Sequence, residues 1–146
     1  MKVSTRGRYG LRALVDMAIH SGDAPISLVQ VANRQKISLN YLEQVFGTLR
    51  KAGIVSSIKG AGGGYKLARA AEEITVREVL EALEGEFSII DRVAGEERDE
   101  IQEAIEELVW SRIDTTVNMF LEQKTLKMLE EEYKKKLEDS TQMYYI

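Results

Sequence analysis

Apolar residues recur at helical spacing within residues 38–52, at positions i, i+3, i+4 and i+7. These apolar residues are Leu42, Val45, Phe46 and Leu49. The spacing predicts a helix that buries one face. The opposite face then carries amide, hydroxyl and cationic side chains, namely those of Asn40, Gln44, Thr48 and Lys51. Such an outer face suits the DNA major groove, where these groups hydrogen-bond to base edges.

A strand, a glycine-rich loop and a second strand are expected to follow this helix. Gly53 ends the helix, and the segment IVSSIK (54–59) is typical of a strand. The loop GAGGG (60–64) predicts a turn, and YKLA (65–68) can return as the paired strand. A recognition helix followed by a β hairpin indicates a winged helix-turn-helix unit, with the hairpin as its wing.

Capping residues predict three more helices in the first 85 residues. Their expected starts and ends are Ser4 or Thr5 to Gly22, Ser27 to about Lys36, and Thr75 to Gly85. The pairs Ser27 with Gln30 and Thr75 with Glu78 have the spacing of a capping box, and Ser38 is expected to cap the recognition helix.

The rest of the chain predicts a connector over 86–95 and then a long helix from about Glu96. An apolar stripe runs along this helix for about seven turns, too long for a small domain to bury on itself. Its members are Ile101, Ile105, Leu108, Val109, Ile113, Val117, Phe120 and Leu121, with Trp110 in or beside it. We expect a helix of a partner chain to pack on this stripe and bury it. Thr125 can cap a final helix, whose apolar face holds Leu126, Leu129, Tyr133 and Leu137.

The fold class expected from this pattern is mainly α: a winged helix-turn-helix with a two-stranded β wing and a long C-terminal dimerisation helix. We expect a DNA-binding domain over 1–85. Residues 86–146 then form the connector, the dimerisation helix and a C-terminal helix with its tail.

Charge is distributed unevenly along the chain, although the net charge is only -4. Residues 1–69 hold eleven Lys and Arg against three Asp and Glu, a net charge of +8, and residues 70–146 hold nine against twenty-one, a net charge of -12. The basic part coincides with the predicted helix and wing, as expected for a phosphate-binding surface.

Cysteine is absent from the chain, which excludes disulfides, thiolate catalysis and cysteine-ligated metal or iron–sulfur sites. We expect neither a metal nor a cofactor, and no enzymatic activity. No apolar run approaches the length of about 18 residues that a membrane span needs, so a cytoplasmic protein is expected.

Three groups of residues are candidates for binding double-stranded DNA. The phosphate-binding group at the start of the first helix is Lys2, Ser4, Thr5, Arg6, Arg8 and Tyr9. The group on and around the recognition helix is Ser38, Asn40, Tyr41, Glu43, Gln44, Arg50 and Lys51. The group in the wing is Lys59, Gly60, Gly62 and Gly63. Gln44 can pair with adenine, and Glu43 can accept from cytosine N4.

Several alternatives stay open. Glu43 could instead form a surface salt bridge with Arg50 or Lys51. A glycine-rich loop can also bind nucleotide phosphates, but here Tyr65 and a strand follow where a P-loop has Lys-Ser or Lys-Thr and a helix. His20 is the only histidine, and Asp16 can at most orient it, so a structural role is expected. At the level of function, the alternative is a regulatory adaptor that binds a metabolic enzyme without needing DNA.

Three segments together resemble a family of bacterial winged-helix repressors that includes the iron–sulfur cluster regulator, the nitric-oxide-sensing repressor and the cysteine metabolism repressor. The segments are MKVSTRGRYGLRAL, ISLNYLEQVFGTLRKAGIVSSIKGAGGGYKLA and ITVREVLEALEG. The resemblance covers residues 1–85 and implies a homodimer, held by a helix from about Glu96 to Gln123, on a partly palindromic operator. It also implies DNA contacts by Ser38, Asn40, Tyr41, Glu43 and Gln44 and by the wing around Lys59 to Gly64.

Many members of that family bind an iron–sulfur cluster through three cysteines between the fourth helix and the long helix, where this chain has EFSIIDRVAGEER. The cluster-free cysteine metabolism repressor is therefore the nearest analogue. The resemblance implies control of cysteine or sulfur metabolism, with cysteine synthase as a partner protein. The tail Tyr144, Tyr145 and Ile146 is interpreted as the contact with that partner, in which the partner captures the carboxylate of Ile146. An apolar, frayed tail is the alternative.

Overall fold

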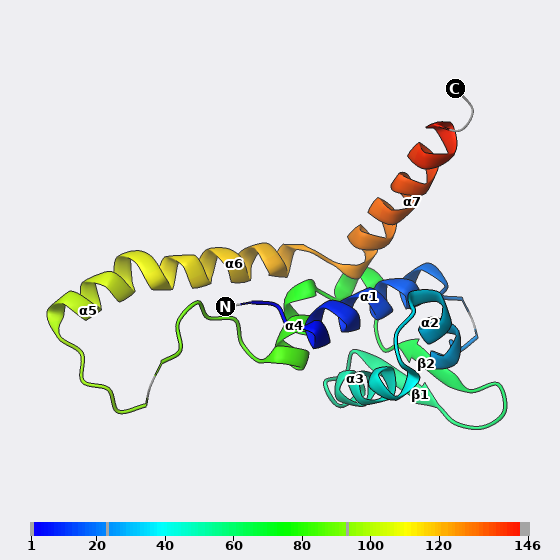
Figure 1. Ribbon diagram of the computed structural model, residues 1–146, viewed down its shortest axis with the longest axis horizontal. Coiled ribbons are helices and arrows are strands. Elements are labelled where there is room, and N and C mark those ends of the chain that lie inside the picture. Colours follow the sequence, from blue (N-terminus) through cyan, green and yellow to red (C-terminus); the bar gives the residue numbers. More distant parts are fainter. Residues whose placement is uncertain (1, 23, 93, 144–146) are drawn as a thin grey trace.

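A computed structural model describes residues 2–22, 24–92 and 94–143. Helices dominate, and the two strands form one antiparallel hairpin (Figure 1). The helices of the first part are α1 Thr5–Ile19, α2 Leu28–Gln35, α3 Leu39–Lys51, the short 3-10 turn η1 Ala71–Glu73 and α4 Val76–Glu84. The strands are β1 Val55–Ile58 and β2 Gly64–Leu67. The second part holds α5 Glu100–Ile105, the π-helical segment η2 Glu106–Trp110, α6 Ser111–Gln123 and α7 Leu126–Met143. The predicted fold class, a winged helix-turn-helix with a long C-terminal helix, is confirmed.

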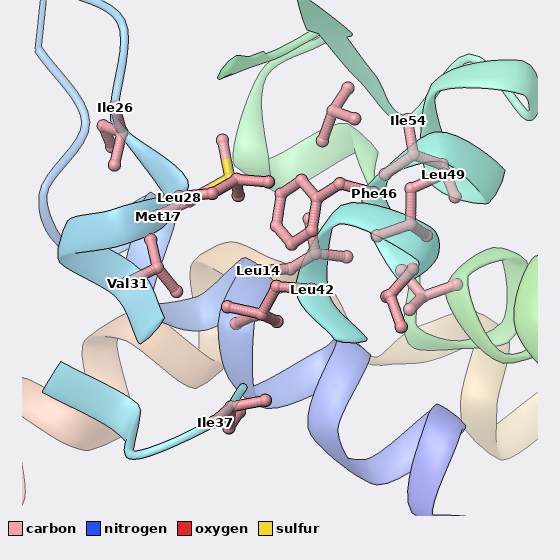
Figure 2. Packing of buried hydrophobic residues seen from close by; sticks show 14 of the residues in the cluster. Leu14, Met17, Ile26, Leu28, Val31, Ile37, Leu42, Phe46, Leu49 and Ile54 are labelled. Carbon is pink, nitrogen blue, oxygen red and sulfur yellow. The ribbon is translucent and has the colours of Figure 1, made fainter. Parts of the chain in front are cut away.

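The core lies where α1, α2, α3 and the base of the wing meet (Figure 2). Phe46 and Leu14 are fully buried at its centre, and the predicted inner face of the recognition helix is buried as a whole. Leu126, the first residue of α7, is also fully buried in this cluster. The start of α7 therefore packs into the core of the first part, although the sequence placed this residue in the separate segment 86–146.

Backbone hydrogen bonds fix this packing. Leu126 N donates to Ile74 O (3.0 Å) and Val76 N donates to Lys124 O (2.8 Å), so the start of α7 forms a short bridge to the start of α4. From there α7 runs away from the core, while α5, η2 and α6 form one long continuous helix on the other side (Figure 1).

Helix capping accounts for most helix starts. Ser4, Ser27, Ser38 and Thr75 cap α1, α2, α3 and α4 as predicted, and Thr75 forms the expected capping box with Glu78. The capping box predicted for Ser27 and Gln30 is wrong: the Ser27 hydroxyl accepts from Val29 N (3.2 Å), while Gln30 N donates to the Ser27 carbonyl oxygen.

The long helix begins at Glu100 and not at the predicted Glu96. Asp99 stops it from extending further, because Asp99 Oδ1 accepts from Gln102 N (2.8 Å) and Gln102 Oε1 accepts from Asp99 N (3.1 Å). This is a capping box built from Asp and Gln. Strand β1 is shorter than the segment 54–59 predicted for it, whereas β2 has the predicted length but begins one residue earlier, at Gly64 in place of Tyr65.

None of the helices in the described residues is both long enough and apolar enough to cross a membrane.

Candidate nucleic-acid interface

The inner face of α3 packs into the core, and most of its outer face is exposed to solvent. Ser38 Oγ accepts from Tyr41 N (3.4 Å) at the start of the helix. Asn40, Glu43 and Gln44, in the first two turns, are exposed, as are Arg50 and Lys51 near the helix end. Tyr41 is half-buried and packs against the core. The side chains predicted to reach base edges therefore lie together on one exposed surface.

Two contacts fix the start of α1 beside α3. Arg6 Nη2 donates to Thr48 Oγ1 (2.6 Å), and the rings of Tyr9 and Tyr41 pack edge to face with centroids 6.2 Å apart. Arg6 and Tyr9 thus belong to the same surface as the recognition helix, and Thr48 holds Arg6 there.

Arg8 faces another way. It borders a groove of about 680 Å³ between α1, α2 and α7, and its Nη2 donates to Thr5 Oγ1 (3.3 Å). The structure does not bring Arg8 to the face of α1 that contacts α3. Lys2, Ser4 and Thr5 are exposed at the start of α1, where the Ser4 backbone N–H donates to the Glu84 carboxylate.

The wing is a hairpin in which Val55 pairs with Leu67 and Ile58 pairs with Gly64. Its turn is closed by a hydrogen bond from Gly63 N to Gly60 O (3.0 Å). A Cβ atom at Gly63 would lie 2.2 Å from Ile58 O, so a side chain there cannot be accommodated without opening the turn. Gly62 has φ +76°, in the left-handed region that favours glycine. The exposed Lys59 stands at the edge of this turn.

A groove of about 420 Å³ separates the wing from the starts of α2 and α3. Glu43 lines its α3 side and Gly63 its wing side. In the part of the chain that the structure describes, no ion pair involves Glu43, so the predicted alternative of a salt bridge to Arg50 or Lys51 is not formed. The carboxylate is free to meet a donor in this groove.

A buried carboxylate fixes α2 on α1. Asp16 is only 2% exposed, and it accepts hydrogen bonds from Arg34 (2.7 Å for the shortest) and from Gln35 Nε2 (2.7 Å). Gln35 Oε1 in turn accepts from Arg12 Nε (2.6 Å). Burial acts to raise the pKa of Asp16, but the hydrogen bonds from Arg34 and Gln35 and the charge of Arg34 outweigh it, so the pKa lies below its ordinary value.

This network was not predicted from the sequence, where Asp16 was considered only as a group that orients His20. That orientation is present as well, since His20 Nδ1 lies 2.8 Å from the Asp16 carbonyl oxygen. The structural role expected for His20 is consistent with this contact. The partners of Asp16 lie 18 and 19 residues further along the chain, so helical spacing carried no signal for them.

A second polar cluster ties the connector to the long helix. Asp114 accepts from Ile89 N (2.8 Å) and Ser88 Oγ (2.8 Å), and Arg92 pairs with Glu106. Burial acts to raise the pKa of Asp114, but these hydrogen bonds and the nearby Arg92 lower it below its ordinary value. The charged form of the carboxylate is thus favoured, and its hydrogen bonds hold the connector on α6.

Much of the apolar stripe of the long helix is exposed to solvent in the single chain. Ile101, Leu108 and Phe120 are 72%, 61% and 56% exposed. Ile105 and Val109 are also exposed, and Trp110, Ile113 and Val117 are half-buried. Residues 144–146, predicted to form a partner-binding tail, lie outside the described residues.

An exposed recognition helix beside a glycine wing, within a basic part of the chain, defines a winged helix-turn-helix DNA-binding protein. The sequence model of the Rrf2 family, described as an iron-dependent transcriptional regulator, matches residues 3–132. The chain therefore belongs to the Rrf2 family of transcriptional regulators.

Curated relatives and solved structures agree with this assignment. The transcriptional regulator IscR of Cereibacter sphaeroides is 44% identical over 131 residues, which cover 86% of this chain and 84% of that protein. Among solved structures, CymR, the global cysteine regulator of B. subtilis, has a TM-score of 0.76 at 39% identity and covers 90% of this chain and 97% of its own. T. potens IscR has a TM-score of 0.73 at 36% identity and covers 91% and 88%. These similarities favour a DNA-binding regulator over the adaptor alternative.

The iron dependence in the family description does not fit this chain. The chain has no cysteine, and among residues 2–22, 24–92 and 94–143 no three His, Cys, Asp or Glu side chains are grouped so that they could hold a metal ion. The ligand set that an iron–sulfur cluster needs is therefore missing. In this chain, Ser88 and Arg92 of the connector contact Asp114 of α6.

Proposed function

We propose that this protein is a homodimeric repressor that occupies a partly palindromic operator and controls genes of cysteine or sulfur metabolism without an iron–sulfur cluster. The observation that carries the DNA-binding part is the free outer face of α3, flanked by the wing and by the start of α1. Gln44 and Asn40 hydrogen-bond to base edges, and Glu43 accepts a hydrogen bond from a base or from another donor in the groove between α3 and the wing. Lys59 and Arg6 bind phosphates.

The exposed stripe on α5, η2 and α6 supports the homodimer. Three of its large apolar side chains are more than half exposed, and such a continuous patch is costly to leave in water. Two copies of one helix, packed antiparallel, cover each other's stripes. The dimer then presents two recognition helices to two operator half-sites, about one helical turn of DNA apart.

The link to cysteine metabolism rests on the similarity to CymR, named the global cysteine regulator, together with the absence of cysteine ligands. Cysteine synthase is the proposed partner, and residues 144–146 are the proposed contact. Repression follows if the operator overlaps a promoter, because the bound dimer then excludes RNA polymerase.

Selection of bound DNA from random fragments of a bacterial genome tests the proposal. We expect recovery of a palindromic sequence upstream of sulfur-metabolism genes, bound with an affinity that falls steeply with salt. The selection is repeated with cysteine synthase, and with a chain lacking residues 144–146 as the matched control. Recovery of no common sequence contradicts the proposed sequence-specific DNA binding. Equal operator affinity with and without cysteine synthase contradicts the proposal that this enzyme is the partner.

A further inference from the structure

A cavity of about 320 Å³ lies where the wing, the end of α1 and the start of α7 meet, away from the outer face of α3. Its volume falls in the range of small-molecule pockets. Apolar side chains form one wall, namely Met17, Ile26 and Leu67. Charged side chains of both signs also line it, namely Lys66, Arg69, Glu72, Lys127 and Glu130. No role in DNA binding or dimerisation accounts for this cavity.

Backbone bridges hold its walls in place. Ile26 and Tyr65 exchange two hydrogen bonds of 2.8 Å, which fasten β2 to the segment before α2. The bridge from Leu126 N to Ile74 O fastens α7 beside η1 on the opposite side. The pocket is therefore formed before any ligand arrives, which lowers the entropic cost of binding.

Glu130 places a buried negative charge in this pocket. It is 6% exposed and accepts from Lys134 Nζ (2.9 Å), with Lys127 Nζ at 3.5 Å. A carboxylate can accept about four hydrogen bonds, so capacity remains for a further donor. Asp16, the other buried carboxylate among the described residues, differs in this respect because Arg34 and Gln35 already supply four hydrogen bonds to it.

Positive charge is available at the same cavity. In the described residues Lys66 makes no ion pair, and the guanidinium of Arg69 is engaged on one side by Glu78 and the Glu73 carbonyl oxygen. Lys66 and Arg69 both line the cavity, so an anionic group that enters it lies near positive charge.

We propose that this pocket binds a small α-amino acid with an apolar side chain. The ligand ammonium donates to Glu130, its carboxylate pairs with Lys66 or Arg69, and its side chain lies on Met17, Ile26 and Leu67. Because β2 forms one wall, the bound amino acid braces the wing against α7. The site thus goes beyond the proposed operator binding and couples a small ligand to it.

Calorimetric titration of the full chain with L-leucine tests the site, using two analogues that each lack one charge. 3-Methylbutylamine is leucine without its carboxylate, and 4-methylpentanoate is leucine without its ammonium. We expect saturable binding of leucine, at least tenfold tighter than that of either analogue. Absence of binding by L-leucine, L-methionine and L-valine overturns the proposal, and so does equal affinity for leucine and the singly charged analogues.

Variants locate the site. Glu130→Gln removes the buried charge and is expected to weaken leucine binding at least tenfold, whereas the matched control Glu131→Gln, at an exposed position, leaves it unchanged. Ala70→Leu fills the cavity from an exposed lining position while every charge stays, and is expected to abolish binding even if Glu130→Gln impairs folding. Unchanged leucine affinity in a folded Ala70→Leu chain places the ligand elsewhere and overturns the assignment.

Operator affinity measured with and without saturating leucine tests the coupling to the wing. A change of at least threefold in the unmodified chain, lost in Ala70→Leu, is expected. Equal affinity in both conditions overturns the coupling. Operator binding in the absence of leucine tests the proposed function separately, so failure of one is distinguishable from failure of the other.

Discussion

Glu43 and Gln44 are neighbours on α3 but face different surroundings. Gln44 points away from the core on the open face of the helix, whereas Glu43 lines the groove between α3 and the wing. Arg6 and Arg8 differ in a similar way, because Arg6 donates to Thr48 on α3 while Arg8 borders the groove toward α7. At the scale of single residues, the direction of the side chain therefore decides which charged or polar groups can act together.

Gln44→Ala is expected to cost about 1–3 kcal/mol of discrimination at one base position, because the alanine removes a bidentate donor and acceptor. Lys59→Ala is the comparison, because it removes a phosphate contact. It is expected to weaken binding to all sequences alike and to lower the slope of log affinity against log salt concentration by about one. Titration of the operator and of single-base variants measures both effects. An equal loss on every sequence for Gln44→Ala would show that this residue does not read a base.

Asp16→Asn is expected to lower the free energy of unfolding by about 2 kcal/mol, since it removes the charge that accepts from Arg34. The native pKa of Asp16 lies below its ordinary value of 3.8. Its contribution is thus complete above that value and is lost as the pH falls through the native pKa. Urea unfolding of both chains at neutral and acidic pH is the measurement. The stability difference should shrink at acidic pH, and a difference that stays constant contradicts the assignment.

At the scale of elements, the wing and α3 are fixed by different means. Hydrophobic burial fixes α3, whose inner face contributes the fully buried Phe46 and Leu49 to the core. The wing tip has no core of its own and is fixed by backbone geometry, with the turn closed between Gly60 and Gly63. Changes to the wing tip should therefore alter DNA binding while the fold of the remainder persists.

Gly63→Val is expected to reduce operator affinity at least tenfold with little change in thermal stability, because the new side chain collides with Ile58 O and opens the turn. Ala61→Val, at the exposed tip of the same loop, is the control and should bind as the unmodified chain does. Gel-shift titration gives the affinity, and circular dichroism gives the melting temperature. Normal operator binding by Gly63→Val would mean that the wing does not contribute.

At the scale of the whole molecule, α5, η2 and α6 extend beyond the core and α7 diverges from it (Figure 1). The long helix leaves Ile101, Leu108 and Phe120 of its apolar stripe more than half exposed, whereas Val117 lies near α4 and the connector. Residues 1–69, which hold α1 to α3 and the wing, carry a net charge of +8, whereas residues 70–146 carry -12.

Leu108→Glu is expected to convert the proposed dimer into monomers, because it places a charge in the middle of the apolar stripe. Glu103→Ala, on an exposed position of the same helix, should leave the dimer intact. Sedimentation measurements give the mass, and a monomer should also bind the operator at least a hundredfold more weakly because it loses one half-site. A dimeric Leu108→Glu protein would place the interface elsewhere.

The sequence by itself determined the order of the helices and the wing, because these follow from local signals: the apolar spacing in α3, the caps Ser38 and Thr75, and the glycines between β1 and β2. It also showed that this chain offers no cysteine as a ligand for a metal or an iron–sulfur cluster. It did not determine the start of the long helix, because an Asp and Gln capping box at Asp99 was not recognised.

Only the tertiary structure decided which distant residues meet. The Asp16 network joins α1 to α2, the Asp114 contacts join the connector to α6, and Leu126 brings the start of α7 into the core. The pocket around Glu130 likewise exists only because the wing and α7 are fastened to opposite sides of one cavity. Such contacts depend on packing between segments far apart in the chain, and residue spacing within one helix or strand carries no information about them.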